Sequence, residues 1–562
     1  MKSYSRFILV LLLGASYVQG QDGVIESNSS LQEFLDKQHT AGLLPNAFLT
    51  HKPLSGNYIR VLLDSLSQKK SLLNERDRRF LDRYLLPTSS PKPNPIKRIL
   101  PKTFTYGESL IALHTKDLRL HVNPILDYRL GTERRSGYED KGERLVWQQT
   151  RGVRIAGSLN KGFYFDTRYD GTLLKPYEGN ITVDPISTLP RYRAVERSWD
   201  TNVDRALYDI PRAIGVAGYT GRYVDIRIGR DTNRWAEGFG SVFLSDYAAE
   251  YDQFRMSTKV WKLEYVNLIA AFDNRFRRDD ILHTRRKYGA FHSLGINISK
   301  RFNITLFESI IFSKDSLGMN KKQIDRPSFD PAYANPVILY QSIEEDLGDL
   351  GNATLGAGGY WIPVNGLKIY GQFLLDEFDF SDYTKTASNQ WTKKYALLAG
   401  FAYTSLPSST VKLEFSQVRP FTYSHHSGQT SYTHYNDYLG HPLGSNFRDI
   451  TLWYHWYAPA DLNLYLTASY TKRGRNSSIN YGGSPLNPYT TRVKDADVQM
   501  FDGVTVKELW SEIRLNKELL PNCFIEFNLN LNRIRDAEKG DSIKLVPMIQ
   551  LRWGQVYRNE RY

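Results

Sequence analysis

The stretch Cys523-Phe524-Ile525-Glu526-Phe527-Asn528-Leu529-Asn530-Leu531-Asn532 alternates apolar and polar side chains for ten residues. Successive side chains of a β-strand point to opposite faces, so the pattern gives one strand an apolar face and a polar face. This length and polarity are typical of a transmembrane β-strand, with apolar side chains in lipid and polar ones in a lumen. Residues 224–229 and 462–469 alternate in the same way. We therefore predict a mainly β chain that forms a transmembrane antiparallel β-barrel.

The lengths of the connections separate this fold from a soluble β-sandwich, which shows the same alternation. Eight short turns are predicted near residues 160–162, 219–222, 257–259, 300–303, 363–366, 407–409, 458–461 and 519–522. Nine long polar segments separate them, around residues 130–145, 167–206, 230–250, 273–287, 312–353, 377–393, 416–448, 472–505 and 534–545. Short turns at one end and long loops at the other are typical of outer-membrane barrels. The pattern predicts about eighteen strands, or sixteen if the uncertain turn at 257–259 is absent.

The chain before the barrel has a different pattern. Residues 1–20 combine early basic residues, the apolar run Phe7–Ala15 and a small-residue end, which predicts a secretory signal peptide. Residues 21–86 are predicted to form a small periplasmic helical cluster. Five prolines then mark a linker at residues 87–103. The barrel is predicted to span residues 104–562.

Three segments of the helical cluster have apolar side chains at helical spacing. A capping box from Ser30 to Glu33 predicts the start of the first helix. The second carries apolar side chains between Ile59 and Leu66. Asn74 is the predicted N-cap of the third.

Composition excludes several classes of protein. The 562 residues include 73 Lys and Arg against 60 Asp and Glu, a net charge of +13. No apolar run is long enough for a transmembrane helix, and the single cysteine, Cys523, excludes an intramolecular disulfide and a cysteine-based zinc site. The basic residues are dispersed and the chain is predicted to be exported, so we expect no nucleic-acid partner. A basic lumen or rim would instead attract acidic polymer or pair with lipopolysaccharide phosphates.

Four histidines, His425, His426, His434 and His441, fall in the predicted loop at 416–448, which is also rich in aromatic residues. Aromatic faces stack on sugar rings, while Asn, Asp, His and Arg bind hydroxyls and acidic groups, so this composition suits carbohydrate. A metal site built from three of the histidines and a purely structural loop are the alternatives, and the histidine spacing matches no closed metal site. The candidate carbohydrate contacts in the loop are Arg419, Tyr423, His425, His434, Tyr435, His441 and Asn446.

A second loop, around residues 230–250, carries Arg230, Arg234 and Trp235. It lacks the glycine pattern and the following helix of a nucleotide site, and we expect it to fold back into the lumen, where these side chains would narrow the channel and meet an anion. Asp376 and Glu377 are adjacent and would point to opposite faces of a strand, so they cannot both face one substrate unless the strand ends between them. No catalytic residue, metal or cofactor is predicted.

Three motifs of the chain resemble the Wzi-type capsule-assembly outer-membrane proteins: Gly229–Asp246, Arg419–His425 and Leu439–Asn446. The segment Leu374–Phe378 is most similar to the branch from Bacteroidetes-like bacteria, some of which are associated with gliding motility. The resemblance implies an eighteen-stranded barrel with an N-terminal periplasmic helical bundle, and the strand count above is not independent of it. It assigns binding roles, by position only, to Arg230, Arg234, Trp235, Arg419, Tyr423, His425, His434 and His441.

The resemblance also implies a lectin-like protein that helps to retain or assemble capsular polysaccharide. We therefore expect a non-enzymatic protein of the Gram-negative outer membrane, whose partners are surface polysaccharide, lipopolysaccharide and membrane lipid. A periplasmic partner for the helical cluster is a further expectation. A channel for small solutes, a structural component of a surface or gliding apparatus, and a barrel hydrolase are the alternatives.

Overall fold

The computed structural model describes residues 24–25, 29–85, 109–137, 142–159, 162–175, 195–196, 207–278, 281–313, 329, 331–336, 340, 351–376, 390–406, 408–458 and 461–554. The predicted signal peptide (1–20) and linker (87–103) lie outside the described residues. Within the described part, no helix is long and apolar enough to cross a membrane.

The N-terminal helical segment (residues 29–85) contains three α-helices, which are α2 (Ser30–Thr40), α3 (Gly56–Ser67) and α4 (Glu75–Leu85). The Ser29 hydroxyl accepts a hydrogen bond from the Gln32 amide (3.2 Å), so the first N-cap is Ser29 and not the predicted Ser30. The predicted Asn74 cap is confirmed by its bond from the Asp77 amide (2.8 Å). The apolar faces of the helices share one buried core, which includes Leu31, Leu35, Ile59, Leu63, Leu66 and Leu81.

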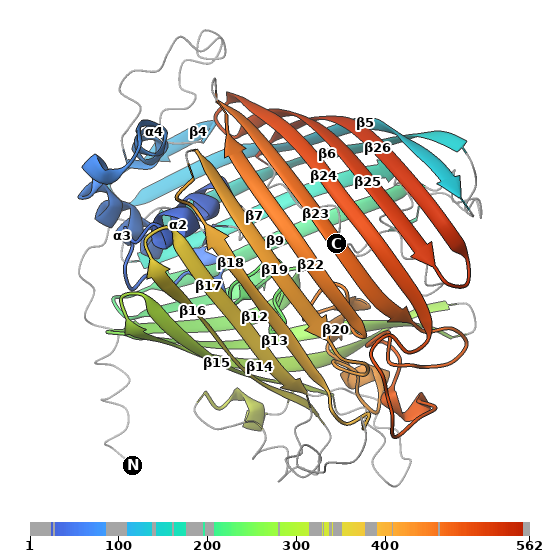
Figure 1. Ribbon diagram of the computed structural model, residues 1–562. Helices are drawn as coiled ribbons and strands as arrows, with labels where there is room; N and C mark the ends of the chain where they lie inside the picture. Colours follow the sequence, from blue (N-terminus) through green and yellow to red (C-terminus); the bar gives the residue numbers. More distant parts are fainter. Residues whose placement is uncertain are drawn as a thin grey trace, which may run out of the picture.

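Eighteen strands of the described chain form a closed antiparallel barrel (Figure 1). Their bounds are β5 (Leu118–Gly137), β6 (Gly142–Leu159), β7 (Phe163–Lys175), β9 (Tyr208–Thr220), β10 (Val224–Asp231), β12 (Tyr251–Val260), β13 (Leu263–Arg278), β14 (Ile281–Ser299), β15 (Phe302–Phe312), β16 (Asn352–Val364), β17 (Leu367–Asp376), β18 (Tyr395–Tyr403), β19 (Ser409–Val418), β22 (Phe447–Tyr457), β23 (Leu462–Arg475), β24 (Val504–Leu520), β25 (Cys523–Asp536) and β26 (Gly540–Trp553). Pairing of β26 with β5 closes the sheet, so no edge is left with unpaired backbone groups.

Shorter elements complete the described chain: β1 (Val24–Ile25), β2 (His51–Lys52), β3 (Leu54–Ser55), β4 (Ile111–His114), β8 (Val195–Glu196), β11 (Arg234–Trp235), β20 (Thr433–His434), β21 (Asp437–Tyr438), η1 (Lys70–Leu72), η5 (Pro331–Ala334), η6 (Gly428–Thr430) and η7 (Tyr489–Thr491). β4 and β8 extend the barrel sheet at β5 and β9. The other short strands form small two-stranded sheets.

The two faces of the barrel wall have the polarity that the alternation predicts. On β25, Glu526 and Asn528 are 2% and 0% exposed, whereas Ile525 and Phe527 are 46% and 44% exposed. The polar residues therefore face inward, and the apolar ones form an outer band together with residues such as Ile228, Phe254, Leu306, Ile369, Leu452, Leu466, Ile513 and Ile549. The predicted fold class is confirmed, with eighteen strands.

The connections differ in length at the two ends of the barrel. Seven of the eight predicted turns join consecutive strands, and the eighth lies at Trp261 and Lys262 and not at the predicted 257–259, which belongs to β12. Three predicted long loops, at 130–145, 273–287 and 534–545, are wrong. There the strands continue as hairpins beyond the apolar band. At the last of these, Arg533 and Arg535 pair with Asp541 across the strands, so both faces are polar and the hydropathic alternation disappears although the ladder continues.

One long connection packs against the outer wall of the barrel. The Tyr340 amide donates to a Glu308 carboxylate oxygen (2.6 Å), and its hydroxyl lies 2.6 Å from His292 Nε2. Tyr340 and Tyr333 also pack on outward apolar side chains of β15. This part of the β15–β16 connection therefore covers polar groups on the outer face.

The outer apolar band predicts that the cost of an outward-facing charged substitution depends on how deep its position lies in the membrane. Replacing Phe527 with Arg puts a cation on the lipid face in the middle of β25, which we expect to cost about 2–4 kcal/mol of unfolding free energy in lipid. Ile543→Arg, on the outward face of β26 near its long-loop end, should cost about 0–1 kcal/mol. Denaturant unfolding in lipid vesicles measures both values. Equal costs at the two positions would show that the band does not span the bilayer as described.

Candidate functional site

Chain segments from both ends of the barrel occupy its lumen. The β10–β12 loop (residues 232–250) enters it, and its strand β11 pairs with β2 of the N-terminal segment. Inside, the Phe243 ring stacks on Phe307 of the wall, with centroids 4.7 Å apart, and the Val242 amide donates to Gln372 Oε1 (2.9 Å). The expectation that this loop folds into the lumen is confirmed.

The β19–β22 loop (residues 419–446) packs on the β10–β12 loop. The hydroxyls of Tyr423 and Tyr432 donate to the carbonyl oxygens of Val242 and Phe243, at 2.8 and 2.7 Å. The two loops and the inner faces of β12–β22 share one hydrophobic core. The interior of the barrel on this side is therefore solid protein.

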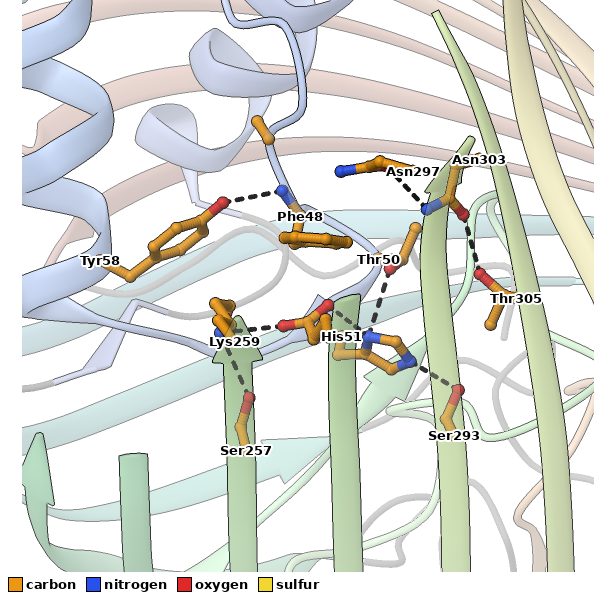
Figure 2. A network of polar contacts seen from close by, with 12 residues as sticks. Phe48, Thr50, His51, Tyr58, Ser257, Lys259, Ser293, Asn297, Asn303 and Thr305 are labelled. Atoms are coloured by element: carbon orange, nitrogen blue, oxygen red, sulfur yellow. Dashed lines mark hydrogen bonds and ion pairs between the residues drawn. The ribbon is translucent and has the colours of Figure 1, made fainter. Parts of the chain in front are cut away.

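The segment between α2 and α3 is held to the inner wall by a buried polar network, shown in Figure 2. His51 lies with Nδ1 2.7 Å from Glu264 Oε2 and with Nε2 2.7 Å from Ser293 Oγ. Lys259 pairs with the other Glu264 oxygen at 2.9 Å. Arg255 donates to the His51 carbonyl oxygen (2.9 Å). These contacts join the N-terminal segment to β12, β13 and β14.

Ser293, His51 and Glu264 are connected in the order of a serine-hydrolase triad. The Ser293 hydroxyl, however, also donates to the Leu306 carbonyl oxygen (3.0 Å), and its side chain is 2% exposed. His51 and Glu264 have fully buried side chains. In this packing the hydroxyl is not accessible to a substrate. The arrangement instead acts as a latch, by which we mean a buried contact that holds the N-terminal segment to the barrel wall.

The acidic side chains of α2 face cations. Burial would raise the pKa of Glu33, but His455, Lys412 and Arg514 hold it below its ordinary value. The same balance of burial against Lys52 lowers the pKa of Asp36, whose carboxylate lies 3.2 Å from the Lys52 Nζ. Both carboxylates therefore stay charged and attach α2 to the mouth of the barrel.

Most aromatic and histidine residues predicted as carbohydrate contacts lie in the packed interior. Trp235, Tyr423 and His434 are completely buried, and Tyr435 and His441 are nearly so. His434 Nδ1 accepts a hydrogen bond from the Asp273 amide (3.0 Å), so Nε2 carries the hydrogen that donates to the Glu250 carbonyl oxygen (3.3 Å). Both nitrogens of this ring are thus used in packing the loop.

The two arginines predicted to narrow the channel point to different sides of the wall. Arg230 shares its face of β10 with the exposed Ile228 and pairs with Asp252 at 2.7 Å. It faces outward, so its predicted place in the lumen is wrong, because the strand continues two residues further than expected. Arg234 does lie in the lumen, where it donates to the Gly238 carbonyl oxygen (2.7 Å).

Three other predicted residues fasten the loops together at the long-loop end. Arg419 donates to the carbonyl oxygens of Lys393 and Val498. Asn446 bonds with the backbone of Phe501 and Asp502. The carbonyl oxygen of His425 accepts from the Tyr489 amide. They hold the β23–β24 loop (residues 476–503) in place and are themselves buried.

At the same end of the barrel, these loops form a partly exposed cluster of side chains that was not predicted from the sequence. The Trp391 and Tyr489 rings lie 4.6 Å apart, and the Arg492 guanidinium lies 4.0 Å from the Trp391 ring centre. Both residues 391 and 489 fall in predicted long loops, but only contacts between loops bring them together. The Trp391 amide also donates to the Asp495 carbonyl oxygen (3.1 Å). We call Trp391, Tyr489 and Arg492 the loop-end cluster.

The alternative of a histidine metal site gains no support from the geometry. Across the described residues, no group of three or more His, Cys, Asp or Glu side chains is arranged to hold a metal ion. His425 instead bonds with Thr430 and lies 3.2 Å from a nitrogen of His426.

The closed sheet, the apolar outer band and the occupied interior define an antiparallel β-barrel of the outer-membrane type that holds its own loops. Its fold is similar to that of Wzi from Escherichia coli, an outer-membrane protein involved in group 1 capsule assembly and described as a carbohydrate-binding β-barrel. That match has a TM-score of 0.54 and 11% identity, and covers 96% of this chain and 100% of Wzi. This likeness shows the fold.

Two Pseudomonas barrels match at lower TM-scores. A BenF-like porin from Pseudomonas fluorescens has a TM-score of 0.43 and 10% identity, covering 77% of this chain and 98% of the porin. OccK8 (OprE) from Pseudomonas aeruginosa has a TM-score of 0.40 and 10% identity, covering 76% and 97%. No family model and no curated protein matches the chain in sequence.

The latch around His51 predicts a large effect from one buried substitution. His51→Ala leaves Ser293 without this partner and the buried Glu264 with Lys259 alone, which we expect to destabilise docking of the N-terminal segment by about 3–5 kcal/mol. Hydrogen exchange of residues 46–55 should become faster while the barrel strands stay protected. Arg60→Ala, which breaks an exposed ion pair on α3, should change the docking free energy by less than about 0.5 kcal/mol. Unchanged protection in the His51 variant would contradict the assigned role.

The acidic face of α2 predicts that the stability of the docked α2 helix depends on pH. Because the folded pKa values of Glu33 and Asp36 are lowered, their stabilisation is complete above their ordinary values of 4.5 and 3.8 and is lost as the pH falls through the folded values. Protection of α2 amides, corrected for intrinsic exchange, should stay constant down to the ordinary values and fall only below them. The double variant Glu33→Gln, Asp36→Asn should lack this dependence, whereas Asp64→Asn on the exposed side of α3 should keep it. A loss centred near neutral pH would refute the proposal.

Proposed function

We propose that this protein is a lectin-like barrel of the Gram-negative outer membrane, which binds surface polysaccharide and helps to retain or assemble it at the cell surface. The observation that carries the proposal is the loop-end cluster. Two aromatic rings and a guanidinium lie together, partly exposed, at the end with the long loops, which faces the outside in outer-membrane barrels. Wzi, which has a similar fold, is described as carbohydrate-binding.

The chemistry of the cluster suits an acidic glycan. Sugar rings pack their C–H faces on aromatic rings, and a guanidinium binds carboxylate or phosphate through paired hydrogen bonds. Thr490, Thr491 and Lys494 are exposed beside it and add donors for hydroxyls and acidic groups. The buried contacts of Arg419 and Asn446 hold Lys393, near Trp391, and the β23–β24 loop in position. Little conformational entropy of these segments is therefore lost on binding. Repeating polymer would engage many copies of the protein, so weak single contacts suffice for retention.

A second basic feature suits lipopolysaccharide at the outer rim. Lys472 and Arg448 are paired across β22 and β23 on the outward face, just beyond the apolar Ile450. Their charged groups lie 4.1 and 5.5 Å from the Phe501 ring centre. At this height they would meet phosphate groups of the outer leaflet. The β19–β22 and β10–β12 loops occupy the lumen and thereby favour a binding role over solute conduction.

The loop-end cluster can be tested by removing its rings. The double variant Trp391→Ala, Tyr489→Ala should bind the producing cell's own surface polysaccharide about tenfold more weakly, which corresponds to ~1.4 kcal/mol. Affinity is measured with the detergent-folded protein at several salt concentrations, because the contribution of Arg492 is screened by salt. Heat-modifiable gel mobility shows whether the barrel is folded.

Trp261→Ala is the matched control, since Trp261 is 83% exposed at the short-turn end. It should bind like the parent protein. Equal affinities of the double variant and the parent would remove the loop-end cluster from the proposal. Steady single-channel conductance in planar bilayers, without selective polysaccharide binding, would favour a channel for small solutes instead.

A further inference from the structure

A cavity of about 580 Å³ lies in the lumen at the helical end of the barrel. Its walls are α2, α4, the β10–β12 loop, the inner faces of strands from β17 to β26 and residues of β6, β9 and β10. The lining includes Ser30 and Arg79, which are exposed, so the cavity reaches the surface beside the helices. Twelve Lys and Arg side chains and nine Asp and Glu side chains line it. Three of the cations, Arg154, Arg212 and Arg552, pair with Asp166, Glu250 and Glu526 behind the lining.

One wall of the cavity is aromatic. Trp453 of β22 lies 6.4 Å from Phe239 and 5.9 Å from Tyr465, measured between ring centres. His455 continues the row, stacked on Tyr465 at 3.9 Å. Trp453 and Phe239 are only partly buried. Trp453 and Phe239 therefore offer partly open apolar surface on which a sugar ring can pack.

Two polar groups on this wall make no hydrogen bond and no close ion pair among the described residues. The Lys412 ammonium lies 4.9 Å from the Trp453 ring centre and 5.8 Å from the Phe239 ring centre, and it makes no ion pair within 4.0 Å among the described residues. Thr410, two residues earlier on β19, is buried, and its hydroxyl has no hydrogen-bond partner. The nearby carboxylates are engaged elsewhere, Glu33 by His455 and Asp36 by Lys52. An ammonium and a hydroxyl thus remain free to bind a ligand beside the aromatic wall.

We propose that this cavity binds an anionic saccharide unit, a sugar ring that carries a carboxylate, entering from the helical end. The ring packs against Trp453 and Phe239, the carboxylate pairs with Lys412, and a sugar hydroxyl bonds with Thr410. Arg514, whose guanidinium lies 3.9 Å from the Tyr465 ring centre, adds positive potential from the adjacent wall. This site is separate from the loop-end cluster and lies at the opposite end of the barrel.

Calorimetric titration of the full-length, detergent-folded protein with glucuronate tests the site, with glucose and inorganic phosphate as comparison ligands. We expect saturable binding of glucuronate, at least fivefold tighter than either comparison ligand. Lys412→Gln should weaken it at least fivefold and Lys412→Arg should restore most of the affinity. Trp453→Leu should also weaken it, and gel mobility before and after heating verifies the fold of each variant.

Matched controls are Lys507→Gln and Trp361→Leu, which replace an exposed cation and an exposed tryptophan of the outer surface. Both should bind glucuronate like the parent. Absence of saturable binding, equal binding of phosphate or glucose, or an unaffected Lys412→Gln variant would each overturn the proposal. Loss of glucuronate binding in Lys412→Gln, with binding retained in Trp391→Ala, Tyr489→Ala, assigns the ligand to the cavity. The reverse pattern assigns it to the loop-end cluster and overturns the cavity site, so the two failures are distinguishable.

Discussion

The width of the barrel is the constraint on which the rest of the structure depends. Small barrels of about eight strands are filled by their own wall side chains, whereas those of about sixteen to eighteen strands leave an open lumen. The polar inner face of this wall cannot meet itself across the interior, so the space must hold water or other chain segments. Here the β10–β12 loop, the β19–β22 loop and the N-terminal segment enter it. Each is held by hydrogen bonds to inward polar side chains, namely Gln372, Lys287 and Glu264 respectively.

The chain segments in the lumen pack more densely against one side of the wall than against the other, so the two sides of the interior differ in polarity. Against β12–β22 the loops form a hydrophobic core that includes Trp235 and Phe243. Against β23–β26 and β5–β7 the wall keeps polar networks, for example Asp127 with Gln550 and Glu526 with Arg552. The cavity borders the second interior. The apolar side holds the loops in place, and the polar side leaves space for the cavity.

The sequence predicts the strands far better than it predicts the site. Alternation identifies a strand wherever lipid faces one side and water the other, and it locates β25 and β23 correctly. It fails where a strand continues into water on both sides, as at Arg533 and Arg535, because hydrogen-bonded pairing does not require an apolar face. Arg230 is misplaced for the same reason. The loop-end cluster could not be found from the sequence, since Trp391 and Tyr489 are ninety-eight residues apart and meet only after the loops fold.

A loop that packs inside a polar barrel has the same composition as a loop that binds sugar, and this explains why the predicted contacts lie in the interior. Both environments require aromatic area combined with hydrogen-bonding tips. Tyr423 and Tyr432 use their rings to fill the lumen and their hydroxyls to bond backbone carbonyl oxygens. Their burial is nevertheless connected to the proposed binding surface, because the same loop carries Arg419 and Asn446, which hold the β23–β24 loop and with it Tyr489 and Arg492. The packed interior therefore supports a partly exposed cluster, whose geometry would not need to form when the proposed ligand binds.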